Sequence, residues 1–113
     1  MMMKTVNLKD GLPSVEQART RLQSEIQIAQ SQGLKLLKII HGYGSQGVGG
    51  ELRIALQSTL RSMAHSGEIR DCIYGEKWRK SDERSWELLK RMPDLKNDPD
   101  LGRGNRGITL ILL

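Results

Sequence analysis

Aromatic residues and cysteine are scarce in this sequence. Phenylalanine is absent, tryptophan and tyrosine occur twice each, and Cys72 is the only cysteine. The core must therefore be built mainly from aliphatic side chains, and Cys72 is expected to be a small buried residue of a strand. A single cysteine excludes both a disulfide framework within one chain and a zinc site made from several cysteines of that chain.

Long hydrophobic runs are also missing. No apolar stretch approaches the ~20 residues that a membrane-spanning helix needs, so we expect no membrane partner. The beginning, Met1–Lys4, passes directly into alternating polar and apolar residues, which predicts that there is no signal peptide. Together these absences predict a cytoplasmic protein.

Positive charge, by contrast, is in excess. The chain has 18 Lys and Arg residues against 13 Asp and Glu, which gives a net charge of +5 and a pI near 9.7. Its 113 residues are enough for one domain, which we place at 1–113. A basic protein of this size makes a polyanion the first partner to consider.

Hydrophobic periodicity predicts alternating strands and helices. Ser14 precedes apolar residues spaced three or four apart, and Gln17 stands where a capping box needs it, so a helix should begin here. The apolar run 34–40 is short and nearly continuous, which is typical of a central strand buried on both faces. Strands are predicted near 4–8, 34–40, 68–74 and 108–113, and helices near 15–32 and 50–65.

Residues 76–102 differ in composition and form a predicted excursion between the third and fourth strands. Ser81 is placed to cap a short helix whose inner face would contain Trp86 and Leu89, with Leu88 as a further candidate. Trp78 either anchors the excursion or, among basic neighbours, stacks on nucleic acid. The order β-α-β-α-β-(α)-β predicts an α/β fold, an α+β two-layer sandwich with a mostly parallel four-stranded sheet and helices packed against it.

A glycine-rich loop, His41–Gly50, follows the second predicted strand. Its residues 42–47 spell G-x-G-x-x-G, but a dinucleotide-binding loop follows the first strand and needs more strands than this chain has. The loop also lacks the Lys-Ser/Thr pair of a P-loop. Glycines still let the backbone approach an anion, and a helix N-terminus adds free N–H groups. Arg53, expected in the first turn of that helix, would add a forked contact to phosphate.

Four segments carry a family resemblance. Ile39–Gly44 (IIHGYG) and Gly49–Arg53 (GGELR) resemble the H-G-x-G…LR motif of the Smr (small MutS-related) domain. Val15–Ala18 (VEQA) resembles the start of the family's first helix, and Asn105–Thr109 (NRGIT) resembles its glycine-rich turn into the last strand. The resemblance covers residues 4–75 and 103–113.

The resemblance implies a β-α-β-α-β-β sandwich, similar to the C-terminal domain of a bacterial translation initiation factor. It also implies binding of DNA or RNA, with endonuclease activity in several members. The family's first motif usually reads L-D-L-H-G, whereas Val6–Gly11 reads VNLKDG and lacks the histidine. The excursion 76–102 is additional to the minimal domain. Binding is therefore expected ahead of cleavage.

Two side chains are candidates for catalysis. The ordinary pKa of histidine lies nearest neutrality, so His41 suits a general acid or base, or else it braces the glycine turn. Asp10 would help to hold a divalent metal or orient His41, or else its side chain closes a local turn. These residues are compatible with a bound divalent metal, and no other cofactor is predicted.

Nucleic-acid contacts are predicted at the same ends of the strands. Tyr43 would stack on a base or fold back as a lid, and Arg103 and Arg106 would contact phosphates or lie in a solvated turn. The phosphate-facing set comprises Lys9, Gly42, Tyr43, Gly44, Gly50, Arg53, Arg103 and Arg106.

Three functions fit these residues. The first is a binding module for structured DNA or RNA, and the second is a nicking endonuclease, a hydrolase of phosphodiester bonds that uses His41 and Asp10. The alternative is a non-catalytic adaptor that contacts another protein through the excursion and keeps a vestigial nucleic-acid site. A steep loss of affinity with salt would distinguish the first two from the third.

Overall fold

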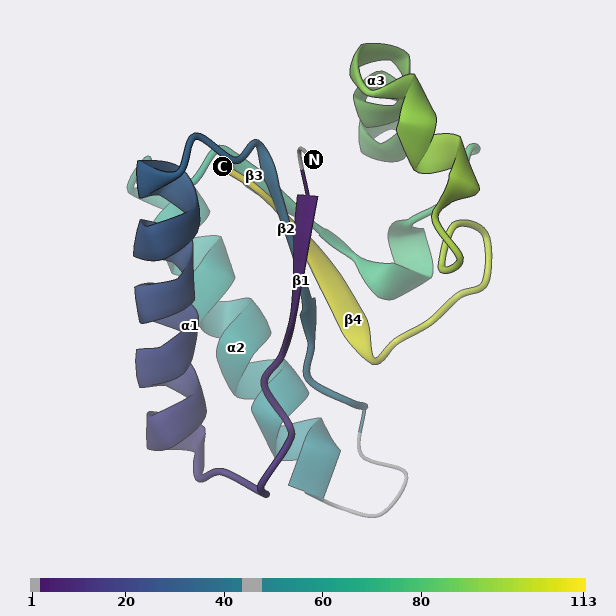
Figure 1. Ribbon diagram of the computed structural model, residues 1–113. Helices are drawn as coiled ribbons and strands as arrows, with labels where there is room; N and C mark the ends of the chain where they lie inside the picture. The colour runs from purple at the N-terminus through teal and green to yellow at the C-terminus, as the bar shows by residue number, and fades with distance from the viewer. Residues whose placement is uncertain (1–2, 44–47) are drawn as a thin grey trace.

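The computed structural model describes residues 3–43 and 48–113 (Figure 1). Strands and helices alternate at first, as β1 (Met3–Asn7), α1 (Val15–Ser31), β2 (Leu36–Ile40), α2 (Val48–His65) and β3 (Asp71–Tyr74). The excursion adds η1 (Gly75–Lys77), α3 (Glu83–Arg91) and η2 (Pro93–Asn97), after which comes β4 (Ile108–Leu112). The predicted order of elements is confirmed.

The four strands form one sheet in the order β1-β2-β4-β3. The prediction that this sheet is mostly parallel is wrong: β1 and β2 are parallel, but β4 runs antiparallel to both β2 and β3. The cause is the excursion, which brings the chain back to the same end of the strands at which β3 finishes. Strand β4 therefore enters between β2 and β3 in the opposite direction. Strand β2 is central, as its apolar run predicted.

Helices α1 and α2 pack side by side against one face of the sheet (Figure 1). The predicted capping box at the start of α1 is present, because the Ser14 hydroxyl accepts from the Gln17 N–H and the Gln17 side chain accepts from the Ser14 N–H. The inner face of α1 is aliphatic, and its buried residues are Ala18, Leu22, Ile26 and Ala29. The core on this side of the sheet forms without phenylalanine, as expected.

The excursion covers part of the opposite face of the sheet. Its anchor is Trp78, which is 1% exposed and packs with Leu88, Leu89 and other aliphatic side chains. The prediction that Trp86 lies on the inner face of the excursion's helix is wrong, because Trp86 is 49% exposed, whereas Leu89 is buried as predicted. Helix α3 is capped by Asp82 rather than by Ser81, and the face it buries contains Ser85, Leu88 and Leu89. Burial of Trp78 also excludes stacking of its ring on nucleic acid.

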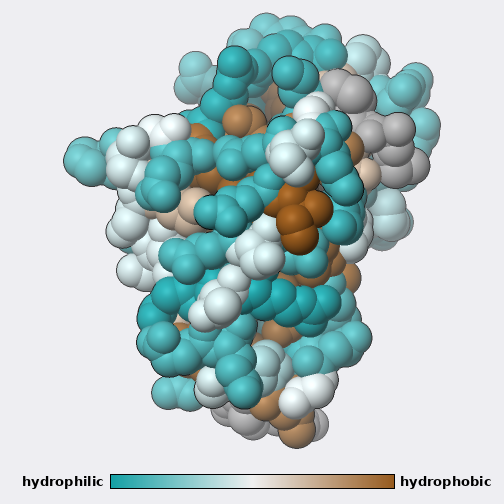
Figure 2. Space-filling view, turned by 60° about the vertical axis from the view of Figure 1, so that its left-hand side comes forward, coloured by the Kyte–Doolittle hydropathy of each residue, from teal (hydrophilic) through white to brown (hydrophobic). Residues whose placement is uncertain are grey.

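Polar residues dominate the surface seen from the α1 side, where brown apolar atoms occur in separate spots (Figure 2). The exposed large apolar side chains among the described residues come from several different elements and loops: Leu12, Ile28, Tyr43, Ile54 and Trp86. In the part of the chain that the structure describes, no helix is long and apolar enough to span a membrane.

Candidate nucleic-acid interface

Three segments meet at one edge of the sheet. Strands β1 and β2 both end there, and β4 begins there, because Asn7 pairs with Ile40 and Ile40 pairs with Ile108. The Gly107 carbonyl then accepts from the N–H groups of His41 and Gly42, at 2.9 and 3.1 Å. The segments after β1 and β2 and the turn before β4 therefore share this edge.

His41 lies fully buried at this edge. Its Nδ1 is 2.6 Å from the Gly42 carbonyl oxygen, so Nδ1 carries the proton and donates. Its Nε2 is then the acceptor and receives the Thr109 hydroxyl at 2.9 Å, while Gln57 donates to the same hydroxyl oxygen at 3.3 Å. Both ring nitrogens are thus occupied by the protein itself.

Burial also keeps the His41 imidazole neutral. Desolvation is the largest influence and lowers the pKa of His41 below its ordinary 6.5, against the hydrogen bond to Gly42, which raises it. The nearby Arg53 lowers the pKa further and Glu76 raises it. Of the two predicted roles, a neutral ring that is hydrogen-bonded at both nitrogens fits the brace, since a brace needs no contact with substrate.

Backbone geometry explains why this brace stands beside a glycine. Gly42 has φ +75°, a conformation that side-chain-bearing residues rarely adopt. Its carbonyl can therefore turn back to the His41 ring while its N–H reaches Gly107. Gly44, which completes the predicted H-G-x-G motif, lies outside the described residues.

The turn after β1 is organised by Asn7, which the sequence prediction missed. The Asn7 side-chain oxygen accepts from the N–H groups of Lys9 and Asp10, at 3.0 and 3.2 Å. An Asn two residues before a Lys-Asp-Gly turn is itself a signal for such a turn. The side chains of Lys9 and Asp10 are exposed, whereas the His41 ring is buried and bonded to Gly42 and Thr109.

A metal site receives no support from the described residues. Across 3–43 and 48–113, His, Cys, Asp and Glu side chains form no group of three or more that could hold a metal ion. Asp10 is therefore an exposed carboxylate of the turn, and its predicted role with a metal has no partner ligands in the part of the chain that the structure describes.

Arg53 is already paired. Its Nη2 donates to Glu76 Oε2 at 2.7 Å, and both side chains are about one-quarter exposed. Glu76 follows β3 in η1 and was not foreseen as part of the site, since nothing in its sequence context marks it. Helix α2 begins at Val48, so Arg53 lies in its second turn rather than its first, and Gly50 lies in its first turn.

Tyr43, Arg103 and Arg106 are brought together around a surface hollow. The hollow has a volume of about 550 Å³ and is also lined by Asp100, Gly104 and Asn105. Tyr43 is 55% exposed, so its side chain does not fold back as a lid over the sheet. Arg103 and Arg106 are exposed, and neither belongs to an ion pair with any residue of the described ranges.

The predicted site therefore divides into parts. One part is the hollow with Tyr43 and the two arginines, and another is the buried brace of His41 with the Arg53–Glu76 pair near it. Lys9 and Asp10 stand on the turn after β1, at the same sheet edge.

Comparison with known proteins agrees with this architecture. The model of the Smr domain matches residues 11–77 of the chain. The crystal structure of the Smr domain of Thermus thermophilus MutS2 is similar, with a TM-score of 0.60 and 21% sequence identity, and the match covers 97% of this chain and 96% of that chain. No curated protein matches the chain. The family model spans more than half of the residues, and the chain belongs to the Smr domain family.

Proposed function

We propose that this protein binds structured DNA or RNA at the sheet edge, through the hollow lined by Tyr43, Arg103 and Arg106. The observation that carries the proposal is the composition of that hollow: an exposed aromatic ring beside two arginines outside the described ion pairs. An exposed ring offers a face on which a base can stack, and arginine forks fit phosphate oxygens. Membership of the Smr family and the net charge of +5 support the same class of ligand.

Cleavage by His41 is not part of the proposal. A general acid or base must reach the proton that it transfers, and both nitrogens of this buried ring are bonded to Gly42 and Thr109. The adaptor alternative stays distinguishable, because contacts with phosphates release counterions and make affinity fall steeply with salt.

The test removes the two arginines. We expect Arg103→Ala/Arg106→Ala to weaken binding of a fluorescein-labelled RNA hairpin, and of its DNA counterpart, by at least about tenfold. The slope of log affinity against log salt should become shallower by about two, one for each lost phosphate contact. Fluorescence anisotropy at several salt concentrations measures both quantities.

The matched control is Arg70→Ala. Arg70 is also exposed, and its N–H donates to the Leu112 carbonyl, which places it at the opposite edge of the sheet. Arg70→Ala removes the same kind of charge but far from the hollow. Affinity should therefore stay within about twofold, and the salt slope should be nearly unchanged. The test variant removes two charges and the control removes one. A loss of log affinity per arginine that is equal in the two variants would reduce the effect to net charge and overturn the proposed site. Undetectable binding by the wild-type protein would overturn the function itself.

A further inference from the structure

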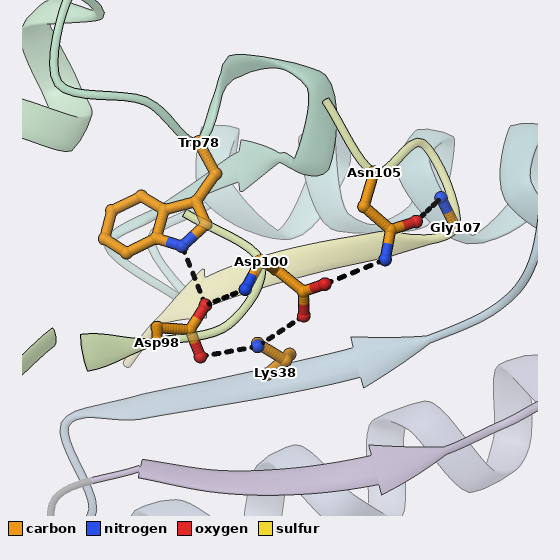
Figure 3. A network of polar contacts seen from close by, with 6 residues as sticks. All are labelled: Lys38, Trp78, Asp98, Asp100, Asn105 and Gly107. Carbon is orange, nitrogen blue, oxygen red and sulfur yellow. Dashed lines mark hydrogen bonds and ion pairs between the residues drawn. The ribbon is translucent and has the colours of Figure 1, made fainter. Parts of the chain in front are cut away.

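A buried lysine stands at the centre of the sheet. Lys38 is on β2, within the apolar run, and is 4% exposed. Its Nζ lies 2.6 Å from a carboxylate oxygen of Asp98 and 2.6 Å from one of Asp100, both in the excursion (Figure 3). A buried charge is costly unless it is paired and hydrogen-bonded, so Lys38 needs the excursion to be docked.

Two carboxylates facing one ammonium need further donors. The Trp78 indole N–H donates to Asp98 at 2.9 Å, and the Asn105 side-chain amide donates to Asp100 at 2.9 Å (Figure 3). Burial alone would raise the pKa of Asp100, but the hydrogen bonds from Lys38 and Asn105 outweigh it and hold that pKa below its ordinary value. Asp100 is therefore a charged acceptor that fixes the Asn105 amide.

The network continues from Asn105 to the candidate interface. The other end of the Asn105 side chain, its oxygen, accepts from the Gly107 N–H at 2.9 Å (Figure 3). The Gly107 carbonyl in turn accepts from the N–H groups of His41 and Gly42. One unbroken series of hydrogen bonds thus joins Lys38, under the excursion, to the first residues of the H-G-x-G loop.

The same side chains also reach the hollow. Asp100 and Asn105 line it together with Tyr43, Arg103 and Arg106. Asn105 lies between the two arginines in sequence and spans from the excursion to the turn before β4. The conformation of that turn therefore depends on a side chain whose own orientation is set by Asp100.

We propose that Asn105 is a positioning residue for nucleic-acid binding, and that the Lys38–Asp100 ion pair sets it in place. The excursion is then a working part of the interface, because it fixes the turn that carries Arg103 and Arg106 and the start of the loop that carries Tyr43. This inference rests on the proposed function for its consequence in binding, but the positioning itself is measurable without any ligand.

The first test is Asn105→Ala, which changes no charge. Hydrogen exchange should become faster at the His41 and Gly42 amides, which are two hydrogen bonds away, and affinity for the RNA hairpin should fall by about tenfold. The control is Leu95→Val, a small loss of packing elsewhere in the excursion, where Leu95 is buried with Trp78. We expect the two variants to lose comparable stability in chemical denaturation, yet in Leu95→Val exchange at residues 41 and 42 and hairpin affinity should stay close to those of the wild type.

The second test restores the hydrogen bond between side chains 100 and 105 with donor and acceptor exchanged. In Asp100→Asn/Asn105→Asp, the new amide at 100 can accept from Lys38 and donate to the new carboxylate at 105, which can still accept from the Gly107 N–H. The net charge is again unchanged. We expect this double variant to recover most of the exchange protection at His41 and Gly42 and most of the hairpin affinity, whereas Asn105→Asp alone recovers neither.

The outcomes separate this inference from the proposed function. Unchanged exchange at residues 41 and 42 in Asn105→Ala, or equal effects in Leu95→Val, would overturn the positioning role. Faster exchange without any loss of affinity would show that the turn does not serve binding and would also overturn it. A wild-type protein that binds neither hairpin, with the exchange pattern as expected, would overturn only the proposed function.

Discussion

His41 stands where the motif places its histidine, and the hydrogen bonds of its ring suit a brace of the loop better than a general acid or base. Its ring donates to Gly42, accepts from Thr109 and is fully buried, so we expect it to contribute to the shape of the loop. A side chain with this environment should affect binding and stability together, since the loop that it braces belongs to the proposed interface.

We expect His41→Ala to lower the free energy of unfolding by about 2–3 kcal/mol, because the proton of the buried Thr109 hydroxyl loses its acceptor and the Gly42 carbonyl loses the His41 donor. Hairpin affinity should fall in the same variant. Chemical denaturation and anisotropy measure the two effects. A variant that keeps its stability and affinity but loses nicking of a supercoiled plasmid would instead establish His41 as an acid or base.

The pH dependence of stability provides the companion measurement. Because burial lowers the pKa of His41 in the folded state, the unfolded chain binds the proton more readily. The contribution of His41 is therefore complete above its ordinary pKa of 6.5 and is lost as the pH falls through the lower folded value. His41→Ala should lack this loss, so the difference in unfolding free energy between wild type and variant should shrink on acidification.

Residue patterns in the sequence indicate exposed candidate residues more readily than buried contacts between distant segments. Tyr43, Arg103 and Arg106 were identified from glycine-rich context and charge, and the structure places them around one hollow. In the sequence Lys38 falls within an apolar run, and its partners Asp98 and Asp100 lie 60 and 62 residues away along the chain. A buried ion pair of such long range has no local signal in the sequence.

At the scale of elements, periodicity located the helices and strands, and it failed where direction and register depend on tertiary contacts. Strand β4 was expected to be parallel because strands and helices alternate, but the excursion reverses the chain before it. The pattern predicts α3 and places Leu89 on its inner face correctly, but it also places Trp86 there, whereas the buried face contains Ser85, Leu88 and Leu89. The nine residues of α3 are too few for their pattern to decide which face is buried. The burial of Trp78 in the core decides it.

The junction between β3 and η1 shows how tightly the elements meet at the site edge. A Cβ atom on Gly75 would lie 1.8 Å from the Asn105 carbonyl oxygen, and backbone atoms cannot move aside as a flexible side chain can. Gly75 therefore lets the end of β3 approach the turn before β4, which carries the two arginines.

We expect Gly75→Ala to lower the free energy of unfolding by more than about 2 kcal/mol, because the clash must displace the backbone of either η1 or the turn. Hairpin affinity should fall with it. The control is Lys77→Ala in the same 3-10 turn, where the side chain is exposed and little change is expected. Equal stability of the two variants, measured by chemical denaturation, would contradict the close approach.

At the scale of the whole molecule, the two faces of the sheet are covered by different parts of the chain. Helices α1 and α2 cover one face, and the excursion covers part of the other through Trp78 and its aliphatic neighbours. The apolar contacts around Trp78 and the ion pairs of Lys38 both cross between excursion and sheet. Undocking the excursion would leave Lys38 unpaired on a central strand, so the excursion and the sheet should unfold together.

The two tryptophans allow this cooperativity to be measured. In Trp86→Phe the exposed tryptophan is gone, and Trp78, at 1% exposure, becomes the only tryptophan and reports docking of the excursion by its fluorescence. We expect its transition in urea to coincide with the loss of helix followed by far-ultraviolet circular dichroism, as a two-state domain requires. A fluorescence transition at clearly lower urea would mean that the excursion undocks from an intact sheet. Coincidence would instead mean that the turn bearing Arg103 and Arg106 is held in place for as long as the fold itself persists.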